Sequence, residues 1–392
     1  MAGFSETTRV GFGARIRNAI KGIGLGVFMV GGATYGIFWN EERAVETARA
    51  LAEGAGLVVE VSAVAPQPSN EGALVHFNGP LKLPFSLRDE VLGVSAAPQT
   101  VRLERVVEQF AWVQSSRTSK ENNIGGSQDQ TTTYTYSKEW TDSPKSGGDF
   151  KVPEGHQNPP MPIQSQIFGH ESGFVGGFEV TNKIEGLGQS VSVSLTADQT
   201  AQIEASLGLS QPATLSAGSV YFASDVQSPN VGDLRISYLV SDIAEVSAVG
   251  IQKGAQLLPY TAENGREVFL VDDGLHNAAE MFDLAQQTNA TITWLWRFGL
   301  LVIMFFGFKA ILGILDVLAS FLPFLGWITS SVTSLISLGL TAFVGLGATA
   351  LAWFYFRPVL SAIILGIALI GAAIFTYFAR KKAKRDPVAN AV

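Results

Sequence analysis

The apolar residues of this 392-residue chain are concentrated at its two ends, and this distribution limits what the chain can fold into. One apolar segment runs from Gly22 to Trp39, and a second, much longer one runs from Trp294 to Phe378. A helix needs about 20 consecutive, mainly apolar residues to span a bilayer. The sequence therefore predicts a membrane protein that is anchored near both ends, with a folded domain between the anchors.

The charges follow the same division. Residues 40–293 carry 15 Lys+Arg and 31 Asp+Glu, a net charge of −16, whereas the two ends carry the remaining 12 basic and 3 acidic residues, a net charge of +9. Nucleic-acid binding needs a basic surface, so no nucleic-acid partner is expected for the acidic centre. The chain has no cysteine, which excludes disulfides, thiolate catalysis and cysteine-ligated metals.

The first span is predicted at residues 22–39, after a basic N-terminus at residues 1–21. We expect it to be retained, because the nearest small-x-small cleavage site, Ala50–Ala52, lies well beyond the apolar core. Small-xxx-small spacing predicts that another helix approaches it closely, although glycine is also simply common in membrane helices. The residues with this spacing are Gly22, Gly26, Gly32 and Gly36.

Residues 294–379 are predicted to form three more spans, at about 295–315, 330–354 and 359–379. The first break is expected between Asp316 and Gly326, and the second at Arg357-Pro358, because a residue before proline avoids the helical region. Asp316 is a candidate intramembrane acid, and its place at a break favours a loop or interface position.

Small and hydroxyl side chains recur every four residues in the middle C-terminal span. This pattern predicts a face that packs on a neighbouring helix, and a pore lining is the alternative. The residues are Ser337, Thr341, Gly345 and Thr349.

The orientation follows from basic residues, which stay on the cytoplasmic side. The N-terminus and the basic tail at residues 380–392 would then both be cytoplasmic, in agreement with four spans. Residues 40–293 would face the periplasm across the inner membrane of a bacterial cell. In a eukaryote the membrane would be that of the endoplasmic reticulum or the inner nuclear membrane.

Residues 40–293 are predicted to form a β-rich domain. Asn40 is expected to cap a short membrane-proximal helix at residues 41–53. Alternating apolar and polar residues then indicate strands. These strands are expected at residues 57–61, 73–77, 101–113, 131–140, 189–195, 219–223 and 234–240.

Three other segments of the central region have a distinct composition. Residues 115–131 are polar, which indicates a loop or a hairpin excursion, and residues 142–166 are rich in proline and glycine, which indicates a long loop. That loop leaves open whether the domain is one β unit or two. A further helix is expected at residues 275–288, with Asp272-Asp273-Gly274 supplying a turn and a capping acid. The fold class is therefore an α+β membrane protein with four transmembrane helices and a β-rich extramembrane domain inserted between the first and the second.

The sequence offers no constellation of catalytic, cofactor-binding or metal-ligating residues. Its four histidines have no metal-ligand spacing, and the pair His170-Glu171 is not part of an HExxH motif. Neither a Walker loop nor a GxGxxG motif is present. No cofactor, metal or catalytic residue is therefore expected. A membrane-bound hydrolase acting on lipid or peptidoglycan would need His170, Glu171 and another carboxylate to meet in one pocket.

Four short segments, taken in order and spacing, resemble the transmembrane protein 43 family, also called LUMA. They are Phe38–Val45 (FWNEERAV), Gly254–Tyr260 (GAQLLPY), Asn289–Trp294 (NATITW) with the following Arg297, and Trp353–Pro358 (WFYFRP). The family-like positions that we single out are Asn40, Glu41, Arg43, Trp294, Arg297, Arg357 and Pro358.

The resemblance covers nearly the whole chain and implies a multi-pass membrane protein, here a bacterial member, with both termini cytoplasmic. It also implies self-association and a role in organising membrane protein complexes. Eukaryotic members have lamins and emerin as partners, which a bacterium lacks, so these are not carried over. The family has no agreed catalytic residues.

The function predicted first is a structural scaffold rather than an enzyme, with membrane lipids, copies of itself and other membrane proteins as partners. The alternatives are a channel or transporter component and, third, the membrane-bound hydrolase.

Overall fold

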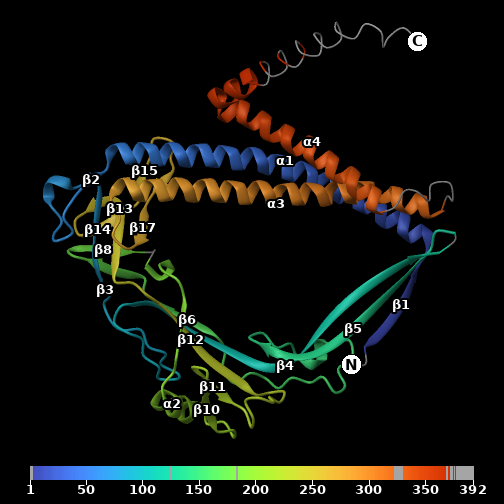
Figure 1. Cartoon of the computed structure of the whole chain (residues 1–392), viewed down its shortest axis with the longest axis horizontal. Helices are drawn as coiled ribbons and strands as arrows, with labels where there is room; N and C mark the ends of the chain where they lie inside the picture. Colours follow the sequence, from blue (N-terminus) through green and yellow to red (C-terminus); the bar gives the residue numbers. More distant parts are fainter. Residues whose placement is uncertain are drawn as a thin grey trace. The chain divides into compact units, whose positions relative to one another are not determined.

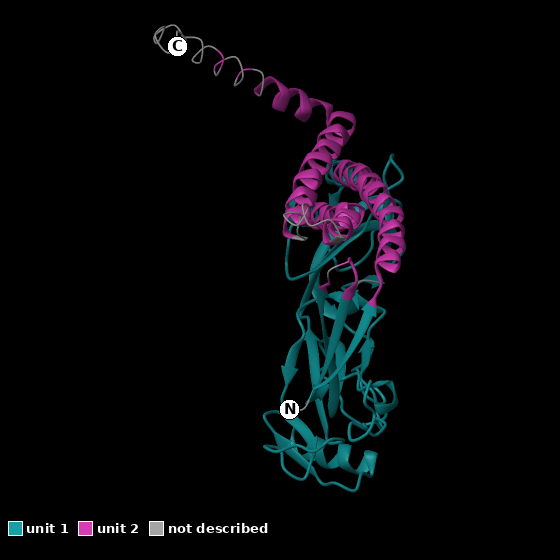
Figure 2. Ribbon diagram, turned by 90° about the vertical axis from the view of Figure 1, so that its right-hand side faces the viewer, with its two compact units in different colours: residues 1–9, 50–121, 129–286 teal, residues 10–49, 122–128, 287–392 magenta. Residues whose placement is uncertain are grey.

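The computed structural model describes residues 3–123, 125–181, 184–321 and 330–367, together with residues 370, 374 and 376. Two compact units are present. Unit 1 comprises residues 1–9, 50–121 and 129–286, and unit 2 comprises residues 10–49, 122–128 and 287–392 (Figure 2). Unit 1 contains the β strands, and unit 2 contains most of the length of the long apolar helices (Figure 1).

Three helices in the described part of the chain are long and apolar enough to cross a membrane. They are α1 (Phe12–Leu57), α3 (Ala278–Phe321) and α4 (Ser330–Phe356). A shorter apolar helix follows at Pro358–Ile367. The last span predicted at residues 359–379 lies partly outside the described residues, and the tail at 380–392 lies wholly outside them. The prediction of a membrane protein with a β-rich domain is confirmed, whereas the fourth span stays a prediction.

Helix α1 differs from the sequence prediction because it is one continuous helix of 46 residues, not a span at 22–39 followed by a separate helix at 41–53. Asn40 is not an N-cap. It lies inside the helix, fully buried, and its Nδ2 donates to the carbonyl oxygen of Thr293 at 3.1 Å. The polar residues that suggested a helix start therefore have partners on a neighbouring helix, so the chain does not break there.

Helix α3 likewise joins the helix predicted at 275–288 to the span predicted at 295–315. Its N-cap is Asn277, not Asp272 or Asp273, since Asn277 Oδ1 accepts from Glu280 N and Glu280 Oε2 accepts from Asn277 N. Helix α3 continues past the end predicted at residue 315 and ends at Phe321, and the rest of the break expected between Asp316 and Gly326 lies outside the described residues. Asp316 sits within the helix and accepts from the hydroxyl of Thr333 at 3.2 Å.

Unit 1 contains an eight-stranded sheet with the order β1-β5-β4-β12-β11-β10, to which β6 adds on β4 and β9 on β12. Its strands are β1 (Phe4–Val10), β4 (Thr100–Asn122), β5 (Gln128–Thr141), β6 (Gln166–Gly169), β9 (Val191–Val193), β10 (Ala213–Ser216), β11 (Ser219–Phe222) and β12 (Leu234–Asp242). A short helix, α2 (Ala197–Leu207), packs near β10.

The second sheet of unit 1 has seven strands in the order β17-β13-β14-β8-β7-β3-β2, and β13 also pairs with β3. Its strands are β2 (Val59–Glu60), β3 (Leu74–Lys82), β7 (Ser172–Val175), β8 (Phe178–Thr181), β13 (Glu245–Lys253), β14 (Gln256–Leu258) and β17 (Leu270–Asp273). A two-stranded ribbon, β15 (Tyr260–Thr261) with β16 (Glu267–Val268), completes the described strands.

The apolar residues whose alternation predicted the strands form the core of unit 1. Every second side chain of β4 is buried from Val101 to Ala111, as a strand with one core face requires. Val101 belongs to a cluster centred on Phe77 and Phe178, and Leu103 belongs to another that includes Ile236 and Phe222. One strand thus contributes to both main clusters of the unit.

The polar segment 115–131 is a hairpin rather than a loop. Strand β4 continues to Asn122 and β5 begins at Gln128, with Gly125 and Gly126 at positive φ in the turn. Between residues 142 and 165 the described chain has no strand, only the short 3₁₀ helix η2 (Gly147–Asp149). Two further 3₁₀ helices are η1 (Pro68–Asn70) and η3 (Ile184–Gly186).

The N-terminus departs most from the predicted organisation. Residues 1–21 were expected to be a cytoplasmic flank, on the opposite side of the membrane from residues 40–293. Instead, residues 4–10 form β1, which pairs with β5 at the edge of the eight-stranded sheet. This pairing is in conflict with placing residues 1–21 and 40–293 on opposite sides.

Candidate functional site

A buried carboxylate, Glu41, sits in the middle of α1 and is the centre of the most extensive polar network in the described part of unit 2. Its side chain is fully buried, and both of its oxygens accept hydrogen bonds from Arg297 of α3. Arg297 Nε is 2.6 Å from Glu41 Oε1, and Arg297 Nη2 is 2.9 Å from Glu41 Oε2. This two-point geometry is the strongest form of a carboxylate–guanidinium pair, and it fixes the rotation of α1 against α3.

Helix α4 meets the same carboxylate from a third direction. The indole Nε1 of Trp353 donates to Glu41 Oε2 at 3.0 Å, and Arg357 Nε lies 3.9 Å from that oxygen. The guanidinium of Arg297 also lies 4.5 Å from the ring centre of Trp294 and 5.4 Å from that of Trp353. Three helices therefore converge on one charge, and aromatic faces shield the cation that neutralises it.

A second layer of amide and hydroxyl groups continues the network along α1 and α3. Arg43 donates to Asn40 Oδ1 at 3.3 Å, to Asn289 Oδ1 at 3.2 Å and to Thr293 Oγ1 at 3.0 Å. Asn289 Nδ2 in turn donates to the carbonyl oxygen of Ala44 at 2.9 Å. We call Asn40, Glu41, Arg43, Asn289, Thr293, Arg297, Trp353 and Arg357 the Glu41 network.

The Glu41 network holds α1, α3 and α4 in one arrangement. Two arginines, Arg297 and Arg357, lie within 4 Å of one carboxylate, and each described contact of the network joins different helices or successive turns of one helix. Among the described residues no group of three or more histidines, cysteines or acids is arranged to hold a metal ion. The arrangement fixes the helices relative to one another, because breaking a buried ion pair leaves an uncompensated charge.

The comparisons with known proteins point to one family. A family model described as Transmembrane protein 43 matches residues 109–358, which is more than half of the chain. The chain belongs to the transmembrane protein 43 family. The human Transmembrane protein 43 is 29% identical over 388 residues, covering 93% of this chain and 92% of the relative, and the mouse protein is 29% identical over 384 residues, covering 92% and 90%.

A homologue in the fruit fly Drosophila melanogaster is also 29% identical, over 97% of this chain and 98% of its own length. No solved structure matches. The similarity therefore extends across both units of this transmembrane protein 43 family member, including the N-terminal part of α1 that precedes the residues matched by the family model.

The structure brings together most of the family-like residues that the sequence singled out. Asn40, Glu41, Arg43, Arg297 and Arg357 are in the network, and Trp294 stacks on its cation. Pro358 begins the short helix after α4 and makes no described contact with the carboxylate. Asp316 is not part of the network, since it bonds Thr333 near the far end of α3.

Sequence reasoning did not place Asn289, Thr293 and Trp353 in a site, although it quoted the segments that contain them. A signal was available, because Asn289, Thr293 and Arg297 are spaced by four and so lie on one helix face. A polar face at the start of an otherwise apolar helix needs partners, and α1 supplies them.

The glycines proposed for helix packing behave differently from one another. A Cβ at Gly26 would lie 2.5 Å from the carbonyl oxygen of Gly307, and one at Gly36 would lie 2.6 Å from Leu300 Cδ2. A Cβ at Gly22 would lie 3.4 Å from the carbonyl oxygen of Ala310, whereas a Cβ at Gly32 would meet nothing within 4 Å. Gly22, Gly26 and Gly36 thus allow close contact with α3, and Gly32 does not take part in the described packing.

The small-residue stripe of α4 faces α3. Ser337 is fully buried, Thr341 nearly so, and a Cβ at Gly345 would lie 2.3 Å from Leu301 Cδ2. The hydroxyls of Ser337 and Thr349 donate to carbonyl oxygens four residues earlier on their own helix, Thr333 and Gly345. These positions line a helix–helix contact within unit 2.

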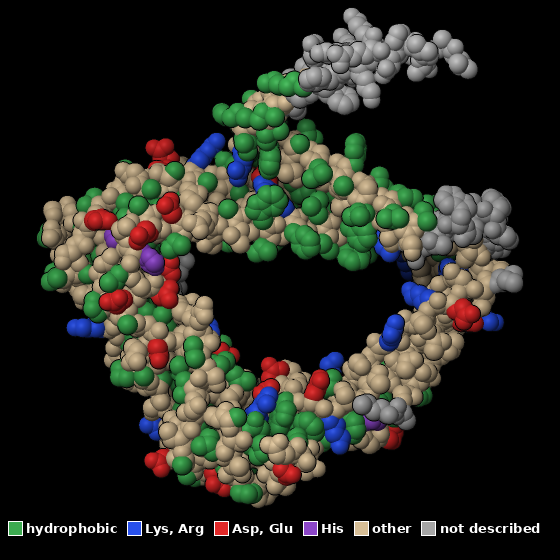
Figure 3. Space-filling model, viewed as in Figure 1, with side chains coloured by type: hydrophobic (Ala, Val, Ile, Leu, Met, Phe, Trp, Pro, Cys, Tyr) green, Lys and Arg blue, Asp and Glu red, His purple; other side chains and the backbone are tan. Residues whose placement is uncertain are grey.

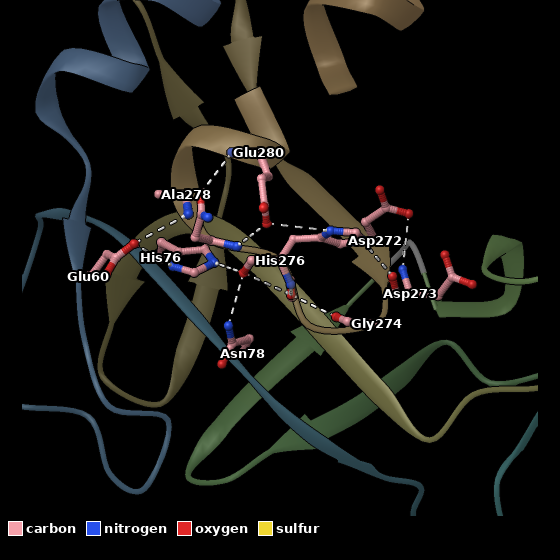
Figure 4. Close-up of polar contacts among 11 residues, drawn as sticks. Glu60, His76, Asn78, Asp272, Asp273, Gly274, His276, Ala278 and Glu280 are labelled. Carbon is pink, nitrogen blue, oxygen red and sulfur yellow. Dashed lines mark hydrogen bonds and ion pairs between the residues drawn. The ribbon is translucent and has the colours of Figure 1, made fainter. Parts of the chain in front are cut away.

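Unit 1 has a second polar centre, at the start of α3 (Figure 4). The imidazole of His76 is buried, its Nε2 is 3.0 Å from the carbonyl oxygen of His276, and its Nδ1 is 3.9 Å from Glu60 Oε1. His276 Nδ1 lies 3.9 Å from Glu280 Oε2. Burial lowers the pKa of His76, which Glu60 and the carbonyl of His276 partly offset. The histidines tie β3 to the N-terminus of α3.

The residues of the hydrolase alternative are not assembled into such a centre. His170 is buried, with its ring 4.7 Å from that of Phe85, and burial lowers its pKa. The adjacent Glu171 is exposed. The two side chains therefore point to different faces of the chain, and no specific observation favours this alternative.

Proposed function

We propose that this chain is a structural scaffold that self-associates in the membrane and holds its β-rich unit at the bilayer. The observation that carries the proposal is the Glu41 network, which locks three apolar helices to one another through a buried ion pair. A rigid helical unit of this kind presents a fixed surface to lipids and to other proteins. A bacterial inner membrane as its location stays a prediction.

Self-association is proposed from the apolar surface of the helices. Large apolar side chains remain exposed on all three long helices (Figure 3), and on α4 the exposed fraction reaches 81% at Phe343. Lipid covers part of such a surface, and a second copy of the chain is proposed to cover the face that contains Phe343. Small and aromatic residues at this face permit the close packing that drives helix association in lipid.

The experiment uses the absence of native cysteine. Phe343→Cys places one thiol on the exposed face of α4, and Ser337→Cys, the matched control, places one on the buried face of the same helix. After mild oxidation in native membranes, we expect a disulfide-linked dimer of the Phe343→Cys chain and none of the Ser337→Cys chain. A Phe343→Cys chain that stays monomeric, together with a parent protein that is monomeric by mass photometry, would refute self-association.

A channel or transporter component is the second candidate, favoured by a cavity of about 1020 Å³ between α3 and α4. Its walls are mainly apolar and include Phe298, Leu338 and Leu346, while Lys309, Ser331 and Ser334 supply polar groups. An apolar wall suits a lipid-like solute better than an ion. Flux of such a solute into liposomes containing the parent protein, reduced by Leu338→Trp, would support this function over the scaffold.

A further inference from the structure

The cavity between α3 and α4, within unit 2, is polar at one end and mainly apolar along the rest of its length. The two helices run antiparallel, because Lys309 bonds Ser334 while Leu301 lies against Gly345. Residues line the cavity at intervals of three or four along each helix, so each helix contributes one face. Its volume of about 1020 Å³ is at the upper end for ligand sites, which extend to about 1,000 Å³. The cavity therefore has room for a large ligand.

The polar end of the cavity is built around Lys309 of α3. Its ammonium donates to Ser334 Oγ of α4 at 2.6 Å, and Ser331 lines the cavity one helical turn from Ser334. In the described part of the chain Lys309 bonds this neutral hydroxyl and no carboxylate, and Asp316, two turns further along α3, bonds Thr333 instead. An ionisable residue in an apolar span is rare and usually paired. A lysine beside two hydroxyls is a suitable set of donors for a phosphate.

A buried hydroxyl without a partner lies further along the cavity. Thr341 is 5% exposed, and its Oγ1 makes no hydrogen bond within the described residues. The hydroxyls of Ser337 and Thr349, on the same helix, donate to carbonyl oxygens four residues earlier, so Thr341 differs from them. The adjacent cavity residues Leu338 and Ala342 are apolar, so a water there would lack the roughly two to four polar partners that it needs. Because buried polar groups are normally bonded, Thr341 indicates a bound molecule that carries an acceptor.

The rest of the cavity has apolar walls that are open on one side. Phe298 of α3 and Leu338 and Leu346 of α4 line it and are 70%, 57% and 64% exposed. Covering such side chains with another apolar group is favourable. From Ser331 to Leu346 the cavity extends about 22 Å along α4, at 1.5 Å per residue. This is about half of the roughly 40–45 Å thickness of a bilayer with its headgroups, and therefore matches the length of one lipid molecule.

We propose that this cavity binds one anionic phospholipid. The lipid phosphate accepts hydrogen bonds from Lys309, Ser331 and Ser334, and an acyl chain covers Leu338 and the apolar walls beyond it. The ester oxygens follow the phosphate in a phospholipid and supply the acceptor that Thr341 lacks. A net negative headgroup fits better than a zwitterionic one, because a zwitterion brings a cation of its own close to the lysine.

The lipid site is a property of unit 2 and does not rest on self-association, so it can hold if the scaffold proposal fails. It also differs from the transport candidate that uses the same cavity. A resident phospholipid stays bound in a fixed ratio when the protein is purified, whereas a transported solute has to be released. Flux into liposomes measures release, and retention of the lipid on the purified protein measures the site.

Native mass spectrometry of the full chain in detergent tests the headgroup contact. Phosphatidylglycerol is the anionic probe, and phosphatidylcholine with the same acyl chains is the zwitterionic one. We expect the parent to retain one phosphatidylglycerol and to bind it about tenfold more tightly than phosphatidylcholine, as for one hydrogen bond between charged groups. Lys309→Gln should abolish this preference, and Lys21→Gln, which removes an exposed lysine of α1, should keep it. Equal affinity of the parent for the two lipids, or an unchanged preference in Lys309→Gln, would overturn the proposal.

The acyl-chain contact is tested by filling the cavity. Leu338→Trp places a larger side chain in it, and Leu351→Trp, the control, changes a 64% exposed leucine of α4 outside the cavity. Phosphatidylglycerol should raise the thermal unfolding midpoint of the parent and of Leu351→Trp, because a ligand that binds only the folded state stabilises it. We expect no such rise for Leu338→Trp, whose midpoint without lipid shows that it is folded. A Leu338→Trp protein that is stabilised as much as the parent would overturn the proposal.

Discussion

A single acidic residue decides how the apolar helices of this protein fit together. Glu41 is fully buried on a helix that sequence analysis treated as ending at Trp39. Desolvating a carboxylate is costly unless a cation and hydrogen-bond donors compensate it, and Arg297 and Trp353 provide both. The buried pair therefore accepts only one arrangement of α1, α3 and α4.

Removing that charge is expected to loosen the helices. Glu41→Gln leaves Arg297 buried without a counter-ion, which typically costs about 3–5 kcal/mol. The matched control is Glu42→Gln, since Glu42 is the exposed neighbour on the same helix. Thermal unfolding of the full chain in detergent, followed by tryptophan fluorescence, should show a lower midpoint for Glu41→Gln and an unchanged one for Glu42→Gln. Equal midpoints for the two variants would show that the pair does not hold the helices.

His76 makes the stability of unit 1 depend on pH. Because burial lowers its pKa, the unfolded chain takes up a proton before the folded one does. Stability should therefore fall as the pH drops below about 6.5, the ordinary value for histidine, and continue to fall until the folded imidazole is itself protonated.

The variant His76→Gln tests this, because its amide can still donate to the carbonyl oxygen of His276. Melting temperatures of the parent should fall more steeply between pH 7.5 and pH 5 than those of the variant. Other buried groups, including His170, also contribute to the parent's pH dependence, so the difference between the two slopes isolates His76. Identical slopes would rule out a contribution from this residue.

At the scale of elements, the strands could be predicted from sequence better than the helix ends. The alternation of apolar and polar residues in 101–113 predicted a strand correctly, because one face of β4 is buried. Beyond residue 113 the sequence left a loop and a hairpin excursion as alternatives, because both faces of β4 are polar and partly exposed there. The helix end predicted near Asn40 was misplaced, since the polar residues there bond to a neighbouring helix, which a sequence alone does not place, and α3 runs past the end predicted at residue 315 to Phe321.

The contact between α1 and α3 depends on glycine at one point more than at others. Gly26→Ala would bring a methyl group to 2.5 Å from the carbonyl oxygen of Gly307, a backbone atom that cannot rotate away. Overpacking of this kind typically costs about 1–3 kcal/mol. At Gly24 the same substitution meets nothing within 4 Å, which makes Gly24→Ala the control.

Both glycine variants are measured by thermal unfolding in detergent. We expect Gly26→Ala to lower the midpoint and Gly24→Ala to leave it unchanged or raise it slightly, because alanine is the better helix former. A Gly26→Ala protein as stable as the parent would mean that the helices separate at this point at no cost.

For the whole molecule, part of the basic charge used to predict the orientation is bonded within unit 1. Arg9 was counted as a free basic flank that would stay in the cytoplasm, yet it is paired with Asp129 in unit 1. The rule on positive residues applies to flanks that are free to choose a side. Residues 4–10 pair instead with residues 128–141, and short-range sequence patterns carry no trace of that long-range pairing.

The orientation of the long helices can be measured on the intact protein in oriented bilayers by polarised infrared spectroscopy. Helices α1 and α3 contain 46 and 44 residues, whereas α4 contains 27, so the first two dominate the helical amide I signal. Because the amide I transition moment lies close to the helix axis, helices along the membrane absorb most strongly for light polarised in the membrane plane. Because α1 and α3 are long and apolar enough to cross a membrane, we expect the parent protein to give a dichroic ratio near that of a single-span helical peptide in the same lipid, which serves as the reference. A dichroic ratio of the opposite sense, with the strongest absorption for light polarised in the membrane plane, would mean that α1 and α3 lie along the bilayer and would contradict this prediction.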